Sequence, residues 1–143
     1  MPPPTFRTKM EKITIIKLGG SLITDKSRPM VAREKIIARL AQEIKIASEL
    51  YPGKLLIGHG SGSFGHSSAA KYQTQKGIIN KASIKGVSEV ADVASKLTKI
   101  VVKHIRKAGL AAVAFAPGSF IVSDKRKEKR FFLEPIKEAL KGG

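Results

Sequence analysis

The sequence predicts an α/β fold, a three-layer sandwich in which helices cover both faces of a mainly parallel sheet. The first observation is that three short apolar runs alternate with two stretches whose apolar residues recur every three or four positions. The second is that helices of this length between strands favour parallel pairing with right-handed crossovers. The chain has 143 residues, 42% of them apolar, which is enough for one globular core.

The first strand and helix are expected in the amino-terminal third. A mostly apolar, partly β-branched run at 13–18 ends at Gly19 and Gly20, as a buried parallel strand does. After a polar turn, a helix is expected to end at residues 51–53, Tyr-Pro-Gly. Its apolar positions fall on one face, at Ile36, Ile37, Leu40, Ala41, Ile44 and Ala47.

The middle of the chain predicts a second strand, a long helix and a third strand. The second strand, at 54–58, leads directly into a glycine-rich stretch, after which a helix should begin near His66. Apolar residues then recur at helical spacing over 87–105, until Gly109. A third apolar run at 110–116 is expected as a strand, with a short extended piece at 120–122.

The remaining segments are simpler. Residues 1–11 include three consecutive prolines and are expected to be a mobile arm. The basic cluster at 125–130 is expected to be a solvated loop, followed by another helix over 134–141. Because much of the predicted sheet would be uncovered, we expect part of a larger domain to be absent from this sequence.

Composition restricts the possible partners. Lys and Arg number 27 against 11 Asp and Glu, so the net charge is +16 and the pI about 10.3, which favours anionic partners. The absence of cysteine excludes disulfides, thiolate metal sites and cysteine nucleophiles. No His, Asp and Glu cluster has ligand spacing, so no metal site built from protein groups alone is expected. Without an apolar run of about 20 residues or a signal peptide, a soluble cytoplasmic protein with no membrane partner is expected.

The first candidate site follows the first strand. Gly19, Gly20 and Ser21 let backbone N–H groups approach a phosphate closely, because glycine has no β-carbon. Lys17 comes just before this turn and Lys26 five residues after it. Many N–H donors and fixed positive charge are what a triphosphate requires, although a tight turn with solvated lysines would have the same sequence.

The second candidate site is the glycine-rich stretch after the second strand. It contains GxGxxG from Gly60 to Gly65. A dinucleotide site also needs an acidic residue at the end of the next strand, about 20 residues on, but that distance reaches the start of a helix here. Neither glycine turn has the Lys-Ser or Lys-Thr of GxxxxGK[ST]. Two turns at two strand ends instead favour two anionic groups held face to face for phosphoryl transfer, with His66 donating a hydrogen bond to one of them.

These segments carry a family resemblance. Residues 16–26 (Ile-Lys-Leu-Gly-Gly-Ser-Leu-Ile-Thr-Asp-Lys) and 58–66 (Gly-His-Gly-Ser-Gly-Ser-Phe-Gly-His) closely resemble the isopentenyl phosphate kinases of the amino acid kinase superfamily. Residues 116–120 (Ala-Pro-Gly-Ser-Phe) resemble a third, weaker segment of that family. The likeness runs from about residue 12 to the end. It implies an amino acid kinase-like fold, of which residues 12–143 would be the amino-terminal, acceptor-binding half.

The resemblance also implies roles for individual residues. Lys26 matches the lysine that stabilises the transferring phosphoryl group, with Lys17 and His66 completing the catalytic set. Ser61 and His66 match positions that contact the phosphate of the acceptor, although Ser61 replaces a frequent glycine. The residues that would hold the ATP phosphates are Lys17, Leu18, Gly19, Gly20, Ser21 and Gly62.

The implied reaction is ATP-dependent phosphorylation of isopentenyl phosphate to isopentenyl diphosphate in isoprenoid biosynthesis. Mg²⁺ would accompany the nucleotide, and the full-length enzyme would be a homodimer. The attacking group is an ionised phosphate oxygen, so no general base is nominated. Because most of the adenine site lies in the family's other half, we expect these 143 residues alone to bind an acceptor without turning it over.

Two alternatives stay open at this point. A kinase of another small phosphate or phosphonate, such as a fosfomycin kinase, would share the two glycine turns, because the pocket for the acceptor's tail cannot be recognised in the sequence. The charge of +16 and the basic cluster at 125–130 would suit a nucleic-acid-binding module. That reading is disfavoured, because only Phe131 and Phe132 are aromatic neighbours of the cluster.

Overall fold

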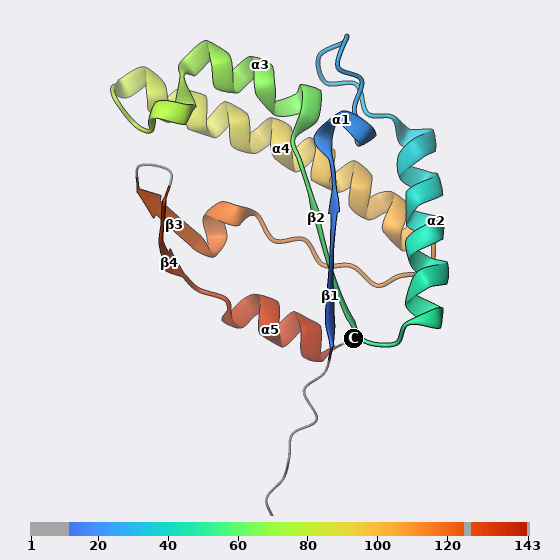
Figure 1. The fold of residues 1–143 in the computed structure, drawn as a ribbon. Helices are drawn as coiled ribbons and strands as arrows, with labels where there is room; N and C mark the ends of the chain where they lie inside the picture. Colours follow the sequence, from blue (N-terminus) through green and yellow to red (C-terminus); the bar gives the residue numbers. More distant parts are fainter. Residues whose placement is uncertain (1–11, 125–126, 143) are drawn as a thin grey trace, which may run out of the picture.

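A computed structural model describes residues 12–124 and 127–142 of the chain. The predicted arm at 1–11 lies outside these residues. Within them, helices and strands follow one another along the chain as Figure 1 shows. The elements are β1 (Ile13–Leu18), α1 (Gly20–Ile23), α2 (Glu34–Leu50), β2 (Lys54–His59), α3 (Gly62–Tyr72), α4 (Lys81–Lys107), β3 (Ile121–Asp124), β4 (Lys127–Phe131) and α5 (Glu134–Lys141), with 3₁₀ turns at Thr74–Lys76 and Pro117–Ser119.

Strands β1 and β2 pair in parallel along their full length. The register runs from Ile13 opposite Lys54 to Leu18 opposite His59. One further bond, from the Gly60 N–H to the Leu18 carbonyl at 2.9 Å, continues the ladder past the strand ends. Parallel strands end at the same edge of a sheet, so this register brings the two glycine turns side by side.

One face of this sheet carries the hydrophobic core. Ile16 and Leu18 of β1 share that face with Leu55 and Ile57 of β2, because side chains alternate along a strand. Helices α2 and α4 cover it with their apolar sides, whose buried members are Ile37, Ala41, Ile44, Val93, Leu97, Val101 and Ile105. The predicted amphipathic helix therefore packs on the sheet as expected.

The opposite face of the sheet is more open. Ile13 and Ile15 point to that side and are 51% and 72% exposed. Helix α5 lies near the beginning of the strands there, where its Leu140 lines a small hollow together with Ile13 and Lys54. The order helix, sheet, helix confirms the predicted layers, with two parallel strands in the described part of the chain.

The predicted third strand at 110–116 is wrong. Leu110 and Ala112 pack against the core cluster, so the apolar run is partly buried as its composition suggests. In the described ranges, however, its backbone joins neither of the two sheets. Apolar side chains predict burial, whereas a strand also needs a neighbouring backbone to bond with.

The segment between β2 and residue 110 differs from the prediction in its helix boundaries. Helix α3 starts at Gly62, four residues before His66, and α4 starts at Lys81 rather than near residue 87. The start of α4 is fixed by a capping box, in which the Asn80 side chain accepts the Ser83 N–H at 3.0 Å. Apolar periodicity cannot reveal such a start, because the first turns of α4 are mostly polar.

The basic cluster was predicted as a loop, and this prediction is also wrong for its described part. Residues 127–131 form β4, which pairs antiparallel with β3, and residues 125–126 lie outside the described ranges. Ile121 faces Phe131 and Val122 faces Arg130 in this hairpin. The extended piece expected at 120–122 corresponds to β3. Helix α5 confirms the helix expected over 134–141.

His104 connects α4 to α2. Its side chain is 11% exposed, and its Nε2 lies 2.8 Å from a carboxylate oxygen of Glu34, at the start of α2. Lys103 approaches the same carboxylate at 3.2 Å. Hydrogen bonds from His104 and then Lys103 lower the pKa of Glu34.

No helix in the described ranges is both long enough and apolar enough to cross a bilayer.

The crossing of α3 and α4 leads to a prediction about stability. A β-carbon on Gly86 would lie 2.2 Å from the β-carbon of Tyr72, and the Tyr72 hydroxyl is bonded to Glu89 at 2.8 Å. We expect Gly86→Ala to lower the free energy of unfolding by about 1–3 kcal/mol, because overpacking outweighs the higher helix propensity of alanine. Urea denaturation measures this free energy. The control is Ser95→Ala, at an exposed position of the same helix. A Gly86→Ala protein at least as stable as wild type would contradict the close crossing.

Candidate functional site

The site is built on the direct contact of two glycine turns. A β-carbon added to Gly20 would lie 2.4 Å from the backbone nitrogen of Gly62, and one added to Gly60 would lie 2.8 Å from that of Gly20. Gly62 has φ +50°, a left-handed conformation that glycine adopts readily. The turns can therefore touch backbone to backbone only because these positions lack side chains.

Backbone N–H groups in both turns are free for a ligand. Within residues 12–124 and 127–142, no hydrogen-bond acceptor is found for the N–H groups of Gly20, Ser21, Ser61 or Gly62. The Gly62 and Ser61 donors lie at the start of α3, an 11-residue helix whose dipole favours negative charge. Unpaired N–H groups at a helix start are a suitable site for a phosphate.

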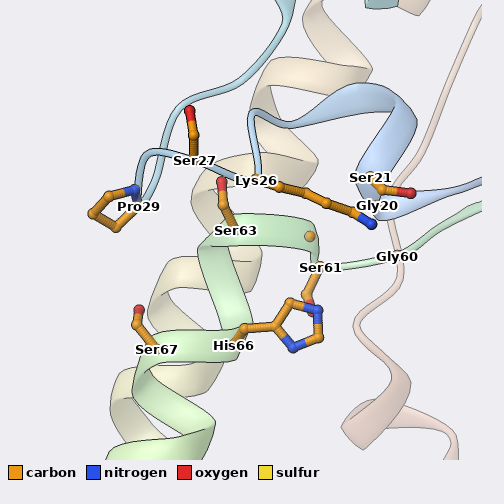
Figure 2. Close-up of a pocket in the computed structure, with 11 residues that line it drawn as sticks. Gly20, Ser21, Lys26, Ser27, Pro29, Gly60, Ser61, Ser63, His66 and Ser67 are labelled. Atoms are coloured by element: carbon orange, nitrogen blue, oxygen red, sulfur yellow. The ribbon is translucent and has the colours of Figure 1, made fainter.

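These donors line a pocket of about 740 Å³, within the usual size range of small-molecule sites. Figure 2 shows it between the turn after β1, the loop that follows α1 and the start of α3. Among the residues that the structure describes, its lining contains no carboxylate. The residues that line it are Gly20, Ser21, Lys26, Ser27, Pro29, Gly60, Ser61, Gly62, Ser63, His66 and Ser67.

Lys26 and His66 reach this pocket from different walls. Figure 2 shows the Lys26 side chain extending toward Ser21 and Gly20, and the His66 ring turned to the side of Ser61. Both side chains are exposed, so a ligand can contact them without a rearrangement of the core. A lysine ammonium, an imidazole and several amide donors around one space are groups that can donate hydrogen bonds to an oxyanion.

The loop that carries Lys26 is held by Asp25. One Asp25 carboxylate oxygen accepts the Ser27 hydroxyl at 2.6 Å and the Ser27 N–H at 2.9 Å, and the other pairs with Arg28 at 2.9 Å. The hydrogen bond from the Ser27 side chain, followed by those from its backbone and from Arg28, lowers the pKa of Asp25 from 3.8 to about 2. Asp25 is therefore ionised at neutral pH and holds Ser27 and Arg28 around the base of Lys26.

Six of the predicted site residues come together in the pocket, namely Gly20, Ser21, Lys26, Ser61, Gly62 and His66. Three others do not line it. Lys17 lies beside Gly58 on the sheet face opposite the core, and the Leu18 side chain is buried with its carbonyl bonded to Gly60. The carbonyl of Gly19 accepts the N–H groups of Leu22 and Ile23 and so starts α1.

His66 does not stand at the helix start, where the sequence suggested it. It lies in the second turn of α3, because the helix already begins at Gly62. Ser63, His66 and Ser67 consequently share one helix face, at the spacing i, i+3 and i+4. That spacing was the signal that could have identified Ser63 and Ser67 as pocket residues.

Other residues around the pocket escaped sequence analysis for lack of a motif. Ser27 and Pro29 line it because the Asp25 turn brings them there. The buried hydroxyl of Ser63 has no hydrogen-bond partner among the described residues. His59 does not line the pocket; its ring nitrogens lie 3.1 Å from the Gly60 carbonyl and 2.9 Å from the Thr98 hydroxyl of α4, which anchors the end of β2.

Comparison with known proteins agrees with this geometry. A sequence profile of the amino acid kinase family matches residues 12–143. This chain belongs to the amino acid kinase family. Its two glycine turns thus lie in the fold of a family that is named for kinases.

Among sequences, this amino acid kinase family member is similar to two archaeal isopentenyl phosphate kinases. It is 34% identical over 138 residues to that of Methanocaldococcus jannaschii, covering 90% of this chain and 52% of the relative. It is 36% identical over 113 residues to that of Methanothermobacter thermautotrophicus, covering 75% of this chain and 41% of the relative. The chain therefore spans about half the length of these relatives.

Among solved structures, the family member is similar to isopentenyl phosphate kinases as well. One X-ray structure has a TM-score of 0.81 and 30% identity, covering 92% of this chain and 55% of the other. The product complex of the T. acidophilum isopentenyl phosphate kinase has a TM-score of 0.77 and 27% identity, covering 92% of this chain and 52% of the other. The fold described above is thus that of one half of these kinases.

The contact between the turns predicts that alanine substitution changes stability differently at Gly62 and at Gly19. A β-carbon on Gly62 would lie 2.0 Å from the Thr24 hydroxyl oxygen, whereas one on Gly19 would meet nothing within 4 Å. We expect Gly62→Ala to cost about 2–4 kcal/mol of unfolding free energy through overpacking and left-handed strain. Gly19→Ala should change it by less than about 1 kcal/mol. Thermal and urea unfolding of both variants test this, and equal stabilities would contradict the close contact.

The Asp25 turn predicts a pH dependence. Since the pKa of Asp25 is lower in the folded state, its contribution to stability is complete above the ordinary value of 3.8 and is lost as pH falls toward about 2. We expect carbon NMR of the Asp25 carboxyl to titrate near 2, with the loop unchanged between neutral pH and about pH 4. In Ser27→Ala the titration midpoint of Asp25 should rise toward 3.8, because the hydrogen bond from the Ser27 side chain, which lowers this pKa most, is removed. A wild-type midpoint near 3.8 would show that the turn does not form in solution.

Proposed function

We propose that this chain forms the phosphate-binding part of a kinase site that transfers the γ-phosphoryl group of ATP to isopentenyl phosphate. The products are isopentenyl diphosphate and ADP. The observation that carries the proposal is the single pocket in which unpaired N–H groups of two glycine turns meet Lys26 and His66. Phosphoryl transfer depends mainly on alignment and charge stabilisation, which such a pocket supplies.

The donor nucleotide is assigned to the first turn. Gly20 and Ser21 offer free N–H groups, and Gly62 adds one from the second turn. Lys26 would neutralise charge on the phosphoryl group during transfer. The remaining members of the nucleotide set are Lys17, Leu18 and Gly19, which shape or flank the turn without lining the pocket.

The acceptor phosphate is assigned to Ser61 and His66. The start of α3 favours an anion there, and the hydroxyls of Ser63 and Ser67 flank His66 on the same helix face. An ionised oxygen of this phosphate attacks the γ-phosphorus of ATP. The new P–O bond forms as the bond to the β,γ-bridging oxygen breaks, and ADP leaves with that electron pair.

The lining of the pocket supports an acceptor that is already ionised. A hydroxyl acceptor would need a general base. No Asp or Glu lines the pocket among the described residues, and His66, the imidazole that could accept a proton there, is assigned to the acceptor phosphate as a hydrogen-bond donor. A monophosphate needs no such base. This is the chemical reason to favour a phosphate over an alcohol as the attacking group.

Mg²⁺ forms part of the proposal as the companion of ATP. When bound, it would neutralise charge on the nucleotide phosphates. The pocket offers serine hydroxyls and amide donors, and the described residues contain no group of three His, Cys, Asp or Glu side chains suited to a metal. These features fit an ion that is held chiefly by the phosphates of the substrate.

The wider setting belongs to the proposal too. The names of the similar proteins support isopentenyl phosphate as the acceptor. Isoprenoid biosynthesis is proposed as the pathway because the family resemblance implies it. We further propose a cytoplasmic location, where ATP and an ionised monophosphate are both available, and a homodimeric enzyme, as the family resemblance implies. Because the relatives are about twice as long, residues 1–143 alone are proposed to bind the acceptor without turning it over.

His66 provides the test of the proposed acceptor site. In the natural protein that carries this chain, ADP release is measured with isopentenyl phosphate and, for comparison, with fosfomycin. We expect His66→Ala to raise KM for isopentenyl phosphate at least about tenfold while KM for ATP changes less than about threefold, because one charge-assisted hydrogen bond is lost.

His104→Ala serves as the control, because His104 contacts Glu34 away from the pocket. It should leave both KM values unchanged. For the 143-residue chain, calorimetry should detect binding of isopentenyl phosphate while no ADP is released. Faster turnover of fosfomycin, or wild-type kinetics in His66→Ala, would overturn the assignment.

A further inference from the structure

Thr24 occupies a central place between the two turns without lining the pocket. It follows α1 directly and is 0% exposed. Its hydroxyl donates to the Gly20 carbonyl at 2.6 Å and accepts the Ser63 N–H at 2.9 Å. The single hydroxyl hydrogen is therefore committed, and Thr24 is linked at once to the first turn and to the start of α3.

Thr24 also determines how closely the turns approach. A β-carbon on Gly62 would lie 2.0 Å from the Thr24 hydroxyl oxygen and 2.8 Å from its methyl carbon. The Thr24 side chain thus fills the space that the glycine leaves empty. Its two branches act as a spacer between the Gly20 and Gly62 backbones, and its two hydrogen bonds keep them from separating.

Thr24 is also connected to the loop after α1, which forms another side of the pocket. The Ser63 N–H bonds to Thr24, and the Ser63 carbonyl accepts the Met30 N–H at 3.2 Å. Met30 lies in the loop between α1 and α2, which also carries Lys26 and Pro29. Thr24 is therefore connected through Ser63 to the loop from which Lys26 enters the pocket.

We infer that Thr24 is a positioning residue, which sets the separation of the two oxyanion-binding turns. The inference rests on the proposed function only in treating the pocket as an oxyanion site. A ligand with one phosphate uses the donors of one turn, whereas a ligand with two joined phosphates needs both turns at a fixed distance. Loss of Thr24 should therefore weaken the second kind of ligand much more than the first.

The probes are inorganic phosphate and inorganic pyrophosphate, titrated by calorimetry into the 143-residue chain. We expect Thr24→Val, which keeps the volume and loses both hydrogen bonds, to weaken pyrophosphate about tenfold and phosphate less than about threefold. Thr24→Ser keeps the hydroxyl and should restore pyrophosphate affinity to within about threefold of wild type. Thr24→Ala removes the hydroxyl without adding a methyl group next to Gly62, and it is measured in parallel in case Thr24→Val does not fold.

The matched control is Ser83→Ala, because Ser83 is also a buried, hydrogen-bonded hydroxyl, 1% exposed, but belongs to the capping box of α4. It should lower the melting temperature and leave both affinities unchanged. If the Thr24 variants lost affinity for phosphate and for pyrophosphate equally, or if both Thr24→Val and Thr24→Ala unfolded, Thr24 would be only a stabilising residue and the inference would be overturned. A wild-type chain that binds no pyrophosphate would overturn it too. Binding of pyrophosphate without binding of isopentenyl phosphate would refute the proposed acceptor and leave the role of Thr24 supported.

Discussion

The parallel pairing of β1 with β2 is the constraint on which the rest of the site depends. Its register places Leu18 opposite His59, so each glycine turn leaves the sheet at the same level. The bond from Gly60 to Leu18 then holds the turns in backbone contact. A shift of one residue in this register would separate the turns by the rise of one residue and reverse the face to which each side chain points.

The pocket combines this rigid base with exposed side chains. Backbone donors are fixed by secondary structure and cost little reorganisation when an anion binds, whereas Lys26 and His66 are exposed side chains that adapt to it. Asp25 limits the freedom of the Lys26 loop through Ser27 and Arg28. Fixed backbone donors combined with adaptable side chains suit a reaction in which two highly charged molecules must enter, align and leave.

Sequence reasoning succeeded where apolar periodicity or glycine spacing determines structure. The strands at 13–18 and 54–58 and the helix carrying Ile37 and Ile44 follow from burial on a sheet. The two turns, together with the family resemblance, identified six pocket residues. It failed where the local structure depends on a partner that is distant in the sequence. Residues 110–116 are apolar but lack a neighbouring strand, and the lysine-rich β4 is extended because β3 pairs with it. Thr24 could not be recognised, because its importance comes from a contact 39 residues away.

The open face of β1 has a consequence for how the chain behaves in concentrated solution. Ile13 and Ile15 are more than half exposed, and within the described ranges each of the two parallel strands has one unpaired edge. Such edges favour association between molecules, which a net charge of +16 opposes by mutual repulsion. That repulsion acts over about 10 Å at 0.1 M salt and about 3 Å at 1 M. Added salt should therefore drive these molecules together, and low ionic strength should keep them dispersed.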